Sequence, residues 1–282
     1  MVKKVYLMAK YKVLMPVLAE RQRLEHSTAK IEDKSKLIVL HNYPDPETLE
    51  IGKKLATEGA TVLPFIGKNR GSPVGWNIGL KEFEKSDIDF VLICAASDIL
   101  YRGMNYTMDA MASMYEKNRN IGSIAIDGSH CWAITRAGFD RVGTFDENIL
   151  PWWCEDTDWG RREYLSGCVA AELSPRDSWD VCQKYSPEYY GHVLNKPDEI
   201  SVQFGANVPL IRKYLVAKWG IDFEQLMHLN EGFRTPYNSG ASLKHWIPNY
   251  RKDVVEAVFN LPLYLSQHPK DEYFHPLKDK CL

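Results

Sequence analysis

Apolar runs alternate with amphipathic stretches along the first hundred residues of the chain. The apolar runs, rich in Val, Ile and Leu, occupy 4–9, 36–42, 60–67 and 88–96. The amphipathic stretches, with apolar residues near helical spacing, occupy 14–31, 46–58 and 72–85. The runs predict buried strands and the stretches predict helices. Their regular alternation is typical of an α/β fold with a mainly parallel sheet and helices on both faces.

The pattern changes beyond residue 100. Methionines recur at helical spacing in the stretch 104–118, which predicts a helix. Such a methionine stripe more often fills a hydrophobic core than lines a ligand site, so we expect these side chains in the core. The stretch 123–149 mixes strand-like and helical segments. Pro, Tyr and Asn become frequent from about residue 185, and a further helix is expected near 207–218.

This change suggests how the chain is organised. We expect one large α/β domain over 1–184 and a mostly helical or irregular C-terminal extension over 185–282. Within the domain, a nucleotide-binding half would span about 1–100, and an acceptor and catalytic half would span about 101–184.

The composition is that of an ordinary soluble protein, because 45% of the 282 residues are hydrophobic and 26% are charged, with a formal net charge of −2. This net charge gives no sign of a polyanionic partner. The six cysteines form neither a C-x-x-C pair nor a set with histidine at zinc spacing, which favours reduced thiols. The basic N-terminal stretch lacks the pattern of a signal peptide, and no window approaches the roughly 20 apolar residues of a membrane span. We therefore expect a cytoplasmic protein.

Ligands of open α/β sheets bind at the carboxyl ends of the strands, so the residues after each predicted strand are the first candidates for a binding site. These residues are Lys10 and Tyr11, Asn42 to Asp45, Asn69 to Gly71, and Ser97 with Asp98. Asp98 follows a buried strand and offers oxygen ligands to a divalent cation, but it is equally suited to cap the next helix.

The segment 67–80 is rich in glycine and asparagine and joins a predicted strand to a predicted helix. Glycine lets a backbone approach a ligand, and a helix N-terminus favours phosphate, so the segment suits a nucleotide. It matches neither the G-x-G-x-x-G nor the P-loop pattern. A tight turn without a ligand is the alternative.

The stretch 152–163 combines Glu155, Asp156 and Asp158 with three tryptophans. Large aromatic surface is seldom left beside charge unless it is buried or bound, so the stretch predicts an acidic, enclosed site in which Asp156 acts as a general base. The alternative is a helix that begins with an acidic first turn and places two arginines one turn later. The tryptophans equally suit a stacking platform for a ligand and a packed support for the loop.

The order of these signals resembles that of the family two glycosyltransferases of the GT-A fold, which are inverting enzymes that use nucleotide-activated sugars. Four passages carry the resemblance: KLIVLHNYPDPETL (36–49), NRGSPVGWNIGL (69–80), AASDIL (95–100) and RAGFDRVGTFDENILPWWCEDTDWGRR (136–162). The last is similar to the family's FDE…ED-x-D element and is the most specific. A weaker likeness at YLVAKWG (214–220) matches a Y-x(3)-KWG pattern found late in many such chains.

The resemblance implies a hexosyl- or pentosyltransferase that moves a sugar from a nucleoside-diphosphate sugar, with a UDP-sugar as the expected donor, to an acceptor hydroxyl. It makes Asp156 the catalytic base and Glu155 a second catalytic residue, which shapes the acceptor site together with Trp153. Asp98 would bind the Mn²⁺ or Mg²⁺ that bridges the diphosphate, whereas Asp158 and Arg161 would support the loop. The resemblance places on the nucleotide side Ala9, Asn42, Asp45, Asn69, Gly71, Asn77 and Asp98, and on the acceptor side Trp132 and Trp153.

Two departures from the family pattern concern the metal. The acidic pair near Asp98 is reduced to one acid, with Ala96 where an Asp or Asn often stands. The histidine that binds metal in many relatives is missing from 171–185, where Asp177 or Asp180 would be the substitute.

The acceptor is not specified by the sequence. The resemblance implies a saccharide on a polymer or a lipid carrier, and the alternative is a hydroxymethylated base in DNA. The basic and aromatic stretches 213–220 and 244–252 suit either phosphate contacts or a solvated surface. Two further interpretations stay open: a degenerate relative that only binds a nucleotide or a glycan, and a nucleotidyltransferase with a similar α/β start.

Overall fold

The computed structural model describes residues 10–17, 21–42, 46–65, 71–94, 99–100, 104–127, 131–147, 149, 154–173, 182–183, 211–212, 215 and 218–219. The chain divides into two compact units. The first comprises Met1–Asn69, Gly75–Thr144 and Arg162–Lys196, and the second comprises Arg70–Val74, Phe145–Arg161 and Pro197–Leu282.

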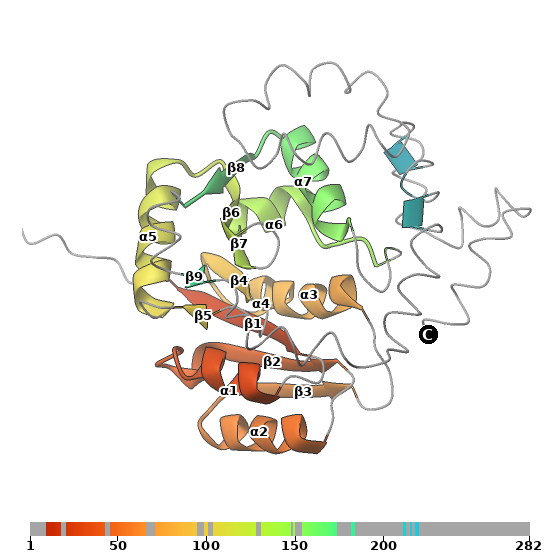
Figure 1. Cartoon of the computed structure of the whole chain (residues 1–282). Coiled ribbons are helices and arrows are strands. Elements are labelled where there is room, and N and C mark those ends of the chain that lie inside the picture. The colour runs from red at the N-terminus through yellow and green to blue at the C-terminus, as the bar shows by residue number, and fades with distance from the viewer. Residues whose placement is uncertain are drawn as a thin grey trace, which may run out of the picture. The chain divides into compact units, whose positions relative to one another are not determined.

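A seven-stranded sheet forms the centre of the first unit. Its strands are β1 (Tyr11–Val17), β2 (Leu37–Asn42), β3 (Thr61–Phe65), β4 (Phe90–Cys94), β6 (Ile121–Asp127), β7 (Cys131–Thr135) and β8 (Val169–Glu172). They lie in the order β3-β2-β1-β4-β7-β6-β8 (Figure 1). Among these described strands only β7 is antiparallel to its neighbours. The expected mainly parallel sheet is therefore confirmed.

Helices and a second, small sheet complete the described elements. The helices are α1 (Arg21–Thr28), η1 (Lys34–Lys36), α2 (Pro46–Thr57), α3 (Ser72–Leu80), α4 (Glu82–Lys85), α5 (Met104–Lys117), α6 (Arg136–Val142) and α7 (Glu155–Leu165). The small sheet pairs β5 (Ile99–Leu100) with β9 (Cys182–Gln183) in antiparallel fashion. No helix formed by the described residues is long and apolar enough to cross a bilayer.

Both faces of the large sheet are buried, as β1 illustrates. Val13, Leu14 and Met15 follow one another and are each at most 1% exposed. Val13 and Met15 share a core cluster with residues of α1, α2 and α5. Leu14 points to the opposite face, because side chains alternate along a strand, and it packs against α3 at Gly79. Helices therefore cover both faces of the sheet.

Two glycines one turn apart allow α3 to pack closely on the sheet. A Cβ atom at Gly75 would lie 2.6 Å from Cδ2 of Leu40, and one at Gly79 would lie 2.6 Å from Cδ2 of Leu14. Both distances are shorter than carbon atoms tolerate. Close packing against β1 therefore favours glycine at Gly79, where Cβ and Cγ of Leu14 also lie within 3.1 Å, whereas the end of the Leu40 side chain can shift away from a Cβ atom at Gly75.

The first strand differs from its prediction. β1 begins at Tyr11, so residues 14–17 belong to a strand and not to the helix expected over 14–31; α1 begins at Arg21. A central strand buried on both faces is a continuous apolar run without the alternation of a half-buried strand, so it resembles a buried helix. The strand expected over 4–9 lies outside the described residues. Lys10 and Tyr11 stand at the amino end of β1, which corrects their expected position after a strand.

The other elements of the first half agree with the sequence pattern. β2, α2, β3 and β4 lie within their predicted ranges. The helix expected over 72–85 is divided at Lys81 into α3 and α4. α5 confirms the helix expected over 104–118, and Met108 and Met111 lie in the core at 1% and 0% exposure.

The C-terminal part is described at few positions. Residues 211–212, 215 and 218–219 are helical, within or next to the helix expected near 207–218. The domain boundary expected at residue 184 lies outside the described residues, as does the rest of the extension.

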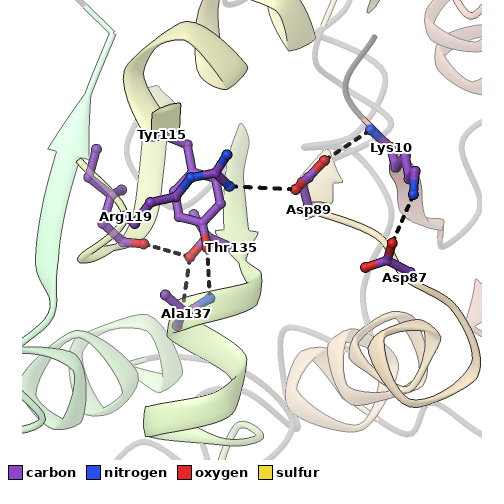
Figure 2. A network of polar contacts seen from close by, with 9 residues as sticks. Lys10, Asp87, Asp89, Tyr115, Arg119, Thr135 and Ala137 are labelled. Carbon is purple, nitrogen blue, oxygen red and sulfur yellow. Dashed lines mark hydrogen bonds and ion pairs between the residues drawn. The ribbon is translucent and has the colours of Figure 1, made fainter. Parts of the chain in front are cut away.

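A polar network ties the amino ends of β1 and β4 to the end of α5 (Figure 2). Lys10 donates from Nζ to Asp87 at 2.8 Å and from its backbone N–H to Asp89 at 3.3 Å. Arg119 pairs with Asp89 at 3.8 Å and lies over the ring of Tyr115. Exposed ion pairs of this kind each add little stability. The network marks the edge of the sheet opposite to the carboxyl ends of β1 and β4.

Candidate active site

The carboxyl ends of the parallel strands meet at one edge of the sheet in the first unit. β2 ends there at Asn42, and β4 ends there at Cys94. The antiparallel β7 begins at the same edge, because Cys131 lies opposite Cys94, and Trp132 follows. The structure thus brings Asn42 and Trp132, both predicted from the sequence, to the edge where open α/β sheets bind ligands.

Trp132 and Asn77 are both buried in the first unit, at 6% and 3% exposure. The ring of Trp132 meets that of Trp76 on α3 edge to face, with the ring centroids 5.8 Å apart. Such aromatic pairs stabilise packing beyond the burial of their area. The acceptor role of Trp132 and the nucleotide role of Asn77 stay predictions.

Gly71 immediately precedes α3 and has a φ of 80°, in the left-handed region that favours glycine. The turn into α3 therefore requires glycine at this position, and a nucleotide role for Gly71 stays a prediction. Ala9 precedes β1 in the sequence, where the prediction had placed it at the end of a strand. The candidates outside the described residues are Ala9, Asp45, Asn69, Asp98 and Trp153.

The small β5–β9 sheet includes the residues that directly follow the predicted metal ligand Asp98 in the sequence. β5 follows Asp98 directly in the sequence, and its Leu100 lies opposite Cys182 of β9. The pairing brings the segment after Asp98 beside the segment after Asp180. Asp98, Asp177 and Asp180 themselves lie outside the described residues. Within the described part of the chain, no group of three His, Cys, Asp or Glu side chains is placed to hold a metal ion.

The acidic stretch forms the first turn of α7 in the second unit. Glu155 and Asp158 are buried at 6% and 0% exposure, whereas Asp156 is half-buried. The Oδ1 atom of Asp156 accepts hydrogen bonds from the backbone N–H of Thr157 at 2.8 Å and from the Thr157 hydroxyl at 3.4 Å. Acidic groups in a first turn interact favourably with the helix dipole. The helix start weighed in the sequence analysis is confirmed, and Asp156 stays partly open to solvent.

Asp158 faces a buried lysine. The Nζ atom of Lys218 lies 2.7 Å from Oδ1 of Asp158 and 2.7 Å from Oδ2 of Asp146. The side chains of Lys218 and Asp158 are 0% exposed, and that of Asp146 is 2% exposed. Charges are costly to bury unless they are paired and hydrogen-bonded, and the shared lysine meets this requirement. Asp156, by contrast, has no ion-pair partner among the residues that the structure describes.

Aromatic side chains enclose this ion cluster. The indole N–H of Trp219 donates to Oδ1 of Asp158 at 3.0 Å, and the guanidinium of Arg161 lies 5.0 Å from the centroid of the Trp219 ring. Burial lowers the pKa of Arg161 to about 10, and the charge of Asp158 opposes this shift. Trp159 is fully buried, with its centroid 5.8 Å from that of Phe145. Trp159 is therefore a packing residue, and the other two tryptophans of the stretch lie outside the described residues.

Cys154 precedes α7 with a φ of 66°, a left-handed conformation that is uncommon outside glycine. Its carbonyl accepts the N–H of Asp158 at 2.9 Å. Burial raises the pKa of the Cys154 thiol to about 12, and the nearby charges of Asp156 and Glu155 add to the shift. The thiol therefore stays protonated at neutral pH and is not a nucleophile.

The sequence analysis did not single out Asp146 or Lys218. Both lie in passages that carry the family resemblance, Asp146 in FDE and Lys218 in KWG. Their pairing joins residues 72 positions apart, so no local pattern connects them.

Comparison with solved structures identifies the fold. The chain is similar to GalNAc-T7 in its complex with UDP, GalNAc and Mn²⁺, with a TM-score of 0.54 and 12% identity over 93% of this chain and 58% of that chain. A mannosyltransferase from Pyrobaculum calidifontis in complex with GDP-Man and Mn²⁺ gives a TM-score of 0.49 and 11% identity over 96% of this chain and 84% of that chain. Residues 1–349 of S. aureus TarS give a TM-score of 0.49 and 14% identity over 96% of this chain and 90% of that chain.

These likenesses concern structure alone. No protein-family model matches the chain, and no curated protein matches it in sequence. The similarity to GalNAc-T7, together with the order of the strands, shows that the chain has the GT-A fold expected from its sequence.

Proposed function

We propose that the chain is an inverting glycosyltransferase that moves a sugar from a nucleoside-diphosphate sugar to an acceptor hydroxyl, with Asp156 as the general base. The observation that carries the proposal is the first turn of α7. There, Asp158 is buried against Lys218, whereas Asp156 is half-buried and has no ion-pair partner among the described residues. A general base must be reachable by the proton that it takes, and Asp156 meets this condition.

The proposed reaction is a single displacement at the anomeric carbon. Asp156 takes the proton of the acceptor hydroxyl while the hydroxyl oxygen forms a bond to the anomeric carbon. The bond from that carbon to the diphosphate oxygen breaks, and the nucleoside diphosphate leaves with the electron pair. Attack from the face opposite to the leaving group inverts the configuration, through a transition state with oxocarbenium character like that of glycoside hydrolysis.

The nucleotide is proposed to bind at the carboxyl edge of the sheet in the first unit. Asn42, Asp45, Asn69 and Asn77 belong to this unit, whereas Gly71 belongs to the second unit. A UDP-sugar is the proposed donor, because GalNAc-T7, which shares the fold, was solved with UDP.

A divalent cation, Mn²⁺ or Mg²⁺, is the proposed cofactor, and Asp98 is its proposed ligand. When bound, such a cation offsets the negative charge that develops on the leaving diphosphate. Two observations support the proposal: Asp98 comes four positions after Cys94, the last residue of β4, in the sequence, and the structure of GalNAc-T7 contains Mn²⁺.

Thermal unfolding with a panel of UDP, GDP, CDP and dTDP, each with and without Mn²⁺, tests the proposal first. A ligand present at about 100 times its dissociation constant adds about 2.7 kcal/mol to the stability of the folded state. For a chain of this size, we expect one nucleotide to raise the midpoint by several degrees, at about 2–4 °C per kcal/mol.

The panel separates the open interpretations. A shift that needs Mn²⁺ and disappears in Asp98→Asn supports the donor site and the metal ligand together. A shift without metal dependence keeps the donor site and removes Asp98 from the metal. The absence of a shift with every nucleotide contradicts the proposed donor class.

Asp156→Asn tests the assignment of the base. We expect this variant to keep the nucleotide-dependent shift and to transfer sugar about 10² to 10⁴ times more slowly, which is the usual contribution of a general base. Asp140→Asn, at an exposed position on α6, is the control and is expected to leave the rate unchanged. Turnover of Asp156→Asn at the wild-type rate would refute the assignment.

A further inference from the structure

The loop that carries Asp156 is closed at its base by two neighbouring contacts in the second unit. Phe145 and Trp159 pack together with their ring centroids 5.8 Å apart. One residue further into the loop on each side, Asp146 and Asp158 share the Nζ atom of Lys218, at 2.7 Å each. The segment between these contacts contains the acidic turn of α7.

All charges of the lysine bridge are buried. The ammonium group of Lys218 has three N–H donors, and the two carboxylates accept from it at short, charge-assisted distances. Trp219 adds an N–H donor to the same oxygen of Asp158. Removing Lys218 leaves two buried carboxylates without a cation, so the lysine is the member that this cluster needs most.

Helix geometry connects this bridge to Asp156. Successive residues of an α-helix are turned by about 100°, so Asp156 and Asp158 point to roughly opposite sides of α7. The exposures agree, because Asp158 is fully buried whereas Asp156 is half-buried. A rotation or an unwinding of the first turn that released Asp158 would change the direction of Asp156.

We propose that Lys218 is a positioning residue for sugar transfer, acting through Asp146 and Asp158 to fix the first turn of α7 and the direction of the Asp156 carboxylate. This inference rests on the proposed function, in which Asp156 is the general base. It adds a role for Lys218, which lies 62 positions after Asp156 in the sequence.

The test compares Lys218→Met, which removes the charge, with Lys218→Arg, which keeps it. We expect Lys218→Met to retain the nucleotide-dependent thermal shift and a donor KM within about threefold of the wild type. Its kcat should fall about 10²-fold, because a misplacement of about 1 Å can cost that much in a preorganised site. Lys218→Arg should recover part of the lost kcat, since a guanidinium can also bridge two carboxylates.

Two further variants separate positioning from folding. Lys53→Met breaks an exposed ion pair of similar length, 2.5 Å to Glu50 on α2, and is expected to leave kcat and KM unchanged. The double variant Asp146→Asn with Lys218→Met removes one charge of each sign. If Lys218→Met does not fold, this double variant takes its place. It should be more stable than Lys218→Met, because only one buried carboxylate is left without the lysine, and its kcat should still be reduced because Asp158 is no longer held.

The outcomes distinguish this inference from the proposed function. A wild-type kcat in a folded Lys218→Met or in the double variant overturns the positioning role while leaving the transferase intact. A loss of activity that only follows the unfolded fraction, measured by circular dichroism at the assay temperature, also overturns it. Absence of turnover in the wild-type protein with every nucleotide sugar refutes the proposed function, and the inference with it.

Discussion

Glu163 is a buried carboxyl group whose surroundings favour its neutral form. It is 2% exposed, and Ser123 donates to its Oε2 atom at 3.0 Å. A Cβ atom at Gly122 would lie 2.5 Å from the other carboxyl oxygen, so the group is closely packed against β6. Burial raises the pKa of Glu163 from 4.5 to about 8, and the hydrogen bonds from Ser123 oppose the shift.

This raised pKa predicts how stability depends on pH. Between pH 4.5 and about 8, the unfolded chain has released the Glu163 proton while the folded protein keeps it. The folded state then binds more protons, so the free energy of unfolding falls as the pH rises through this window. We expect Glu163→Gln to flatten this fall by at least about 1 kcal/mol between pH 5 and pH 8, since one pKa unit corresponds to about 1.4 kcal/mol.

Urea unfolding at pH 5, 6.5 and 8 measures the effect. Glu84→Gln, at an exposed position on α4, is the control and should leave the pH dependence of the wild type unchanged. Parallel pH profiles for the wild type and Glu163→Gln would contradict the assigned protonation of Glu163.

Burial also raises the pKa of the Cys154 thiol, which affects its reactivity. Its thiol has a pKa of about 12, so only about 10⁻⁴ of it is thiolate at pH 8, and the thiolate is the reactive form. We expect Cys154 to resist iodoacetamide at pH 8 in the folded protein and to react fully in urea. Peptide mass spectrometry after quenching measures the modified fraction, and rapid labelling of the folded protein would show that the site is open.

At the scale of elements, α6 lies on β6 through two glycines. Thr135 caps α6 by accepting the N–H of Gly138 at 3.0 Å, and its hydroxyl donates to the carbonyl of Ile121 at 2.6 Å. A Cβ atom at Gly138 would lie 2.1 Å from the carbonyl oxygen of Gly122, which is backbone and cannot turn aside. The helix must therefore move to admit any side chain at this position.

A pair of glycine variants tests this contact. Gly138→Ala should destabilise the protein by about 3 kcal/mol or more, because overpacking against backbone forces a shift of the helix. Gly143→Ala meets no atom within 4 Å, but its φ of 79° and ψ of −150° lie in a region essentially restricted to glycine, so it should cost about 1–3 kcal/mol. Chemical denaturation measures the free energy of unfolding of both variants. Equal losses of stability would argue against the close approach of α6 and β6.

At the scale of the whole molecule, the balance of basic and acidic residues favours a neutral acceptor over a polyanionic one. The chain has 35 basic and 37 acidic residues, and described cations such as Lys10, Arg119 and Lys218 pair with acids. We expect a glycan acceptor, whose binding changes little with salt. A protein that makes 6–10 phosphate contacts on DNA loses about 10³–10⁵ in affinity between 50 and 200 mM salt. Acceptor titrations at these two salt concentrations distinguish the cases, and a steep loss would favour the DNA alternative.

The sequence by itself determined the succession of elements and the fold. The apolar runs at 36–42, 60–67 and 88–96 became strands, because runs of this length and composition are stable when buried in a parallel sheet. The acidic turn at 155–158 begins a helix, which was the alternative weighed for this stretch. The helix expected over 14–31 was wrong at 14–17, because a strand buried on both faces lacks the alternation of a half-buried strand.

Only the tertiary structure decided which acid of the turn is available. The sequence shows Glu155, Asp156 and Asp158 side by side, and nothing local separates their roles. The separation comes from Lys218, sixty positions beyond Asp158, which occupies the buried side of α7 together with Asp146. Such pairings depend on how distant segments pack and not on spacing along the chain. The structure therefore shows what the sequence does not: Lys218 pairs with Asp158, whereas Asp156 has no ion-pair partner among the described residues.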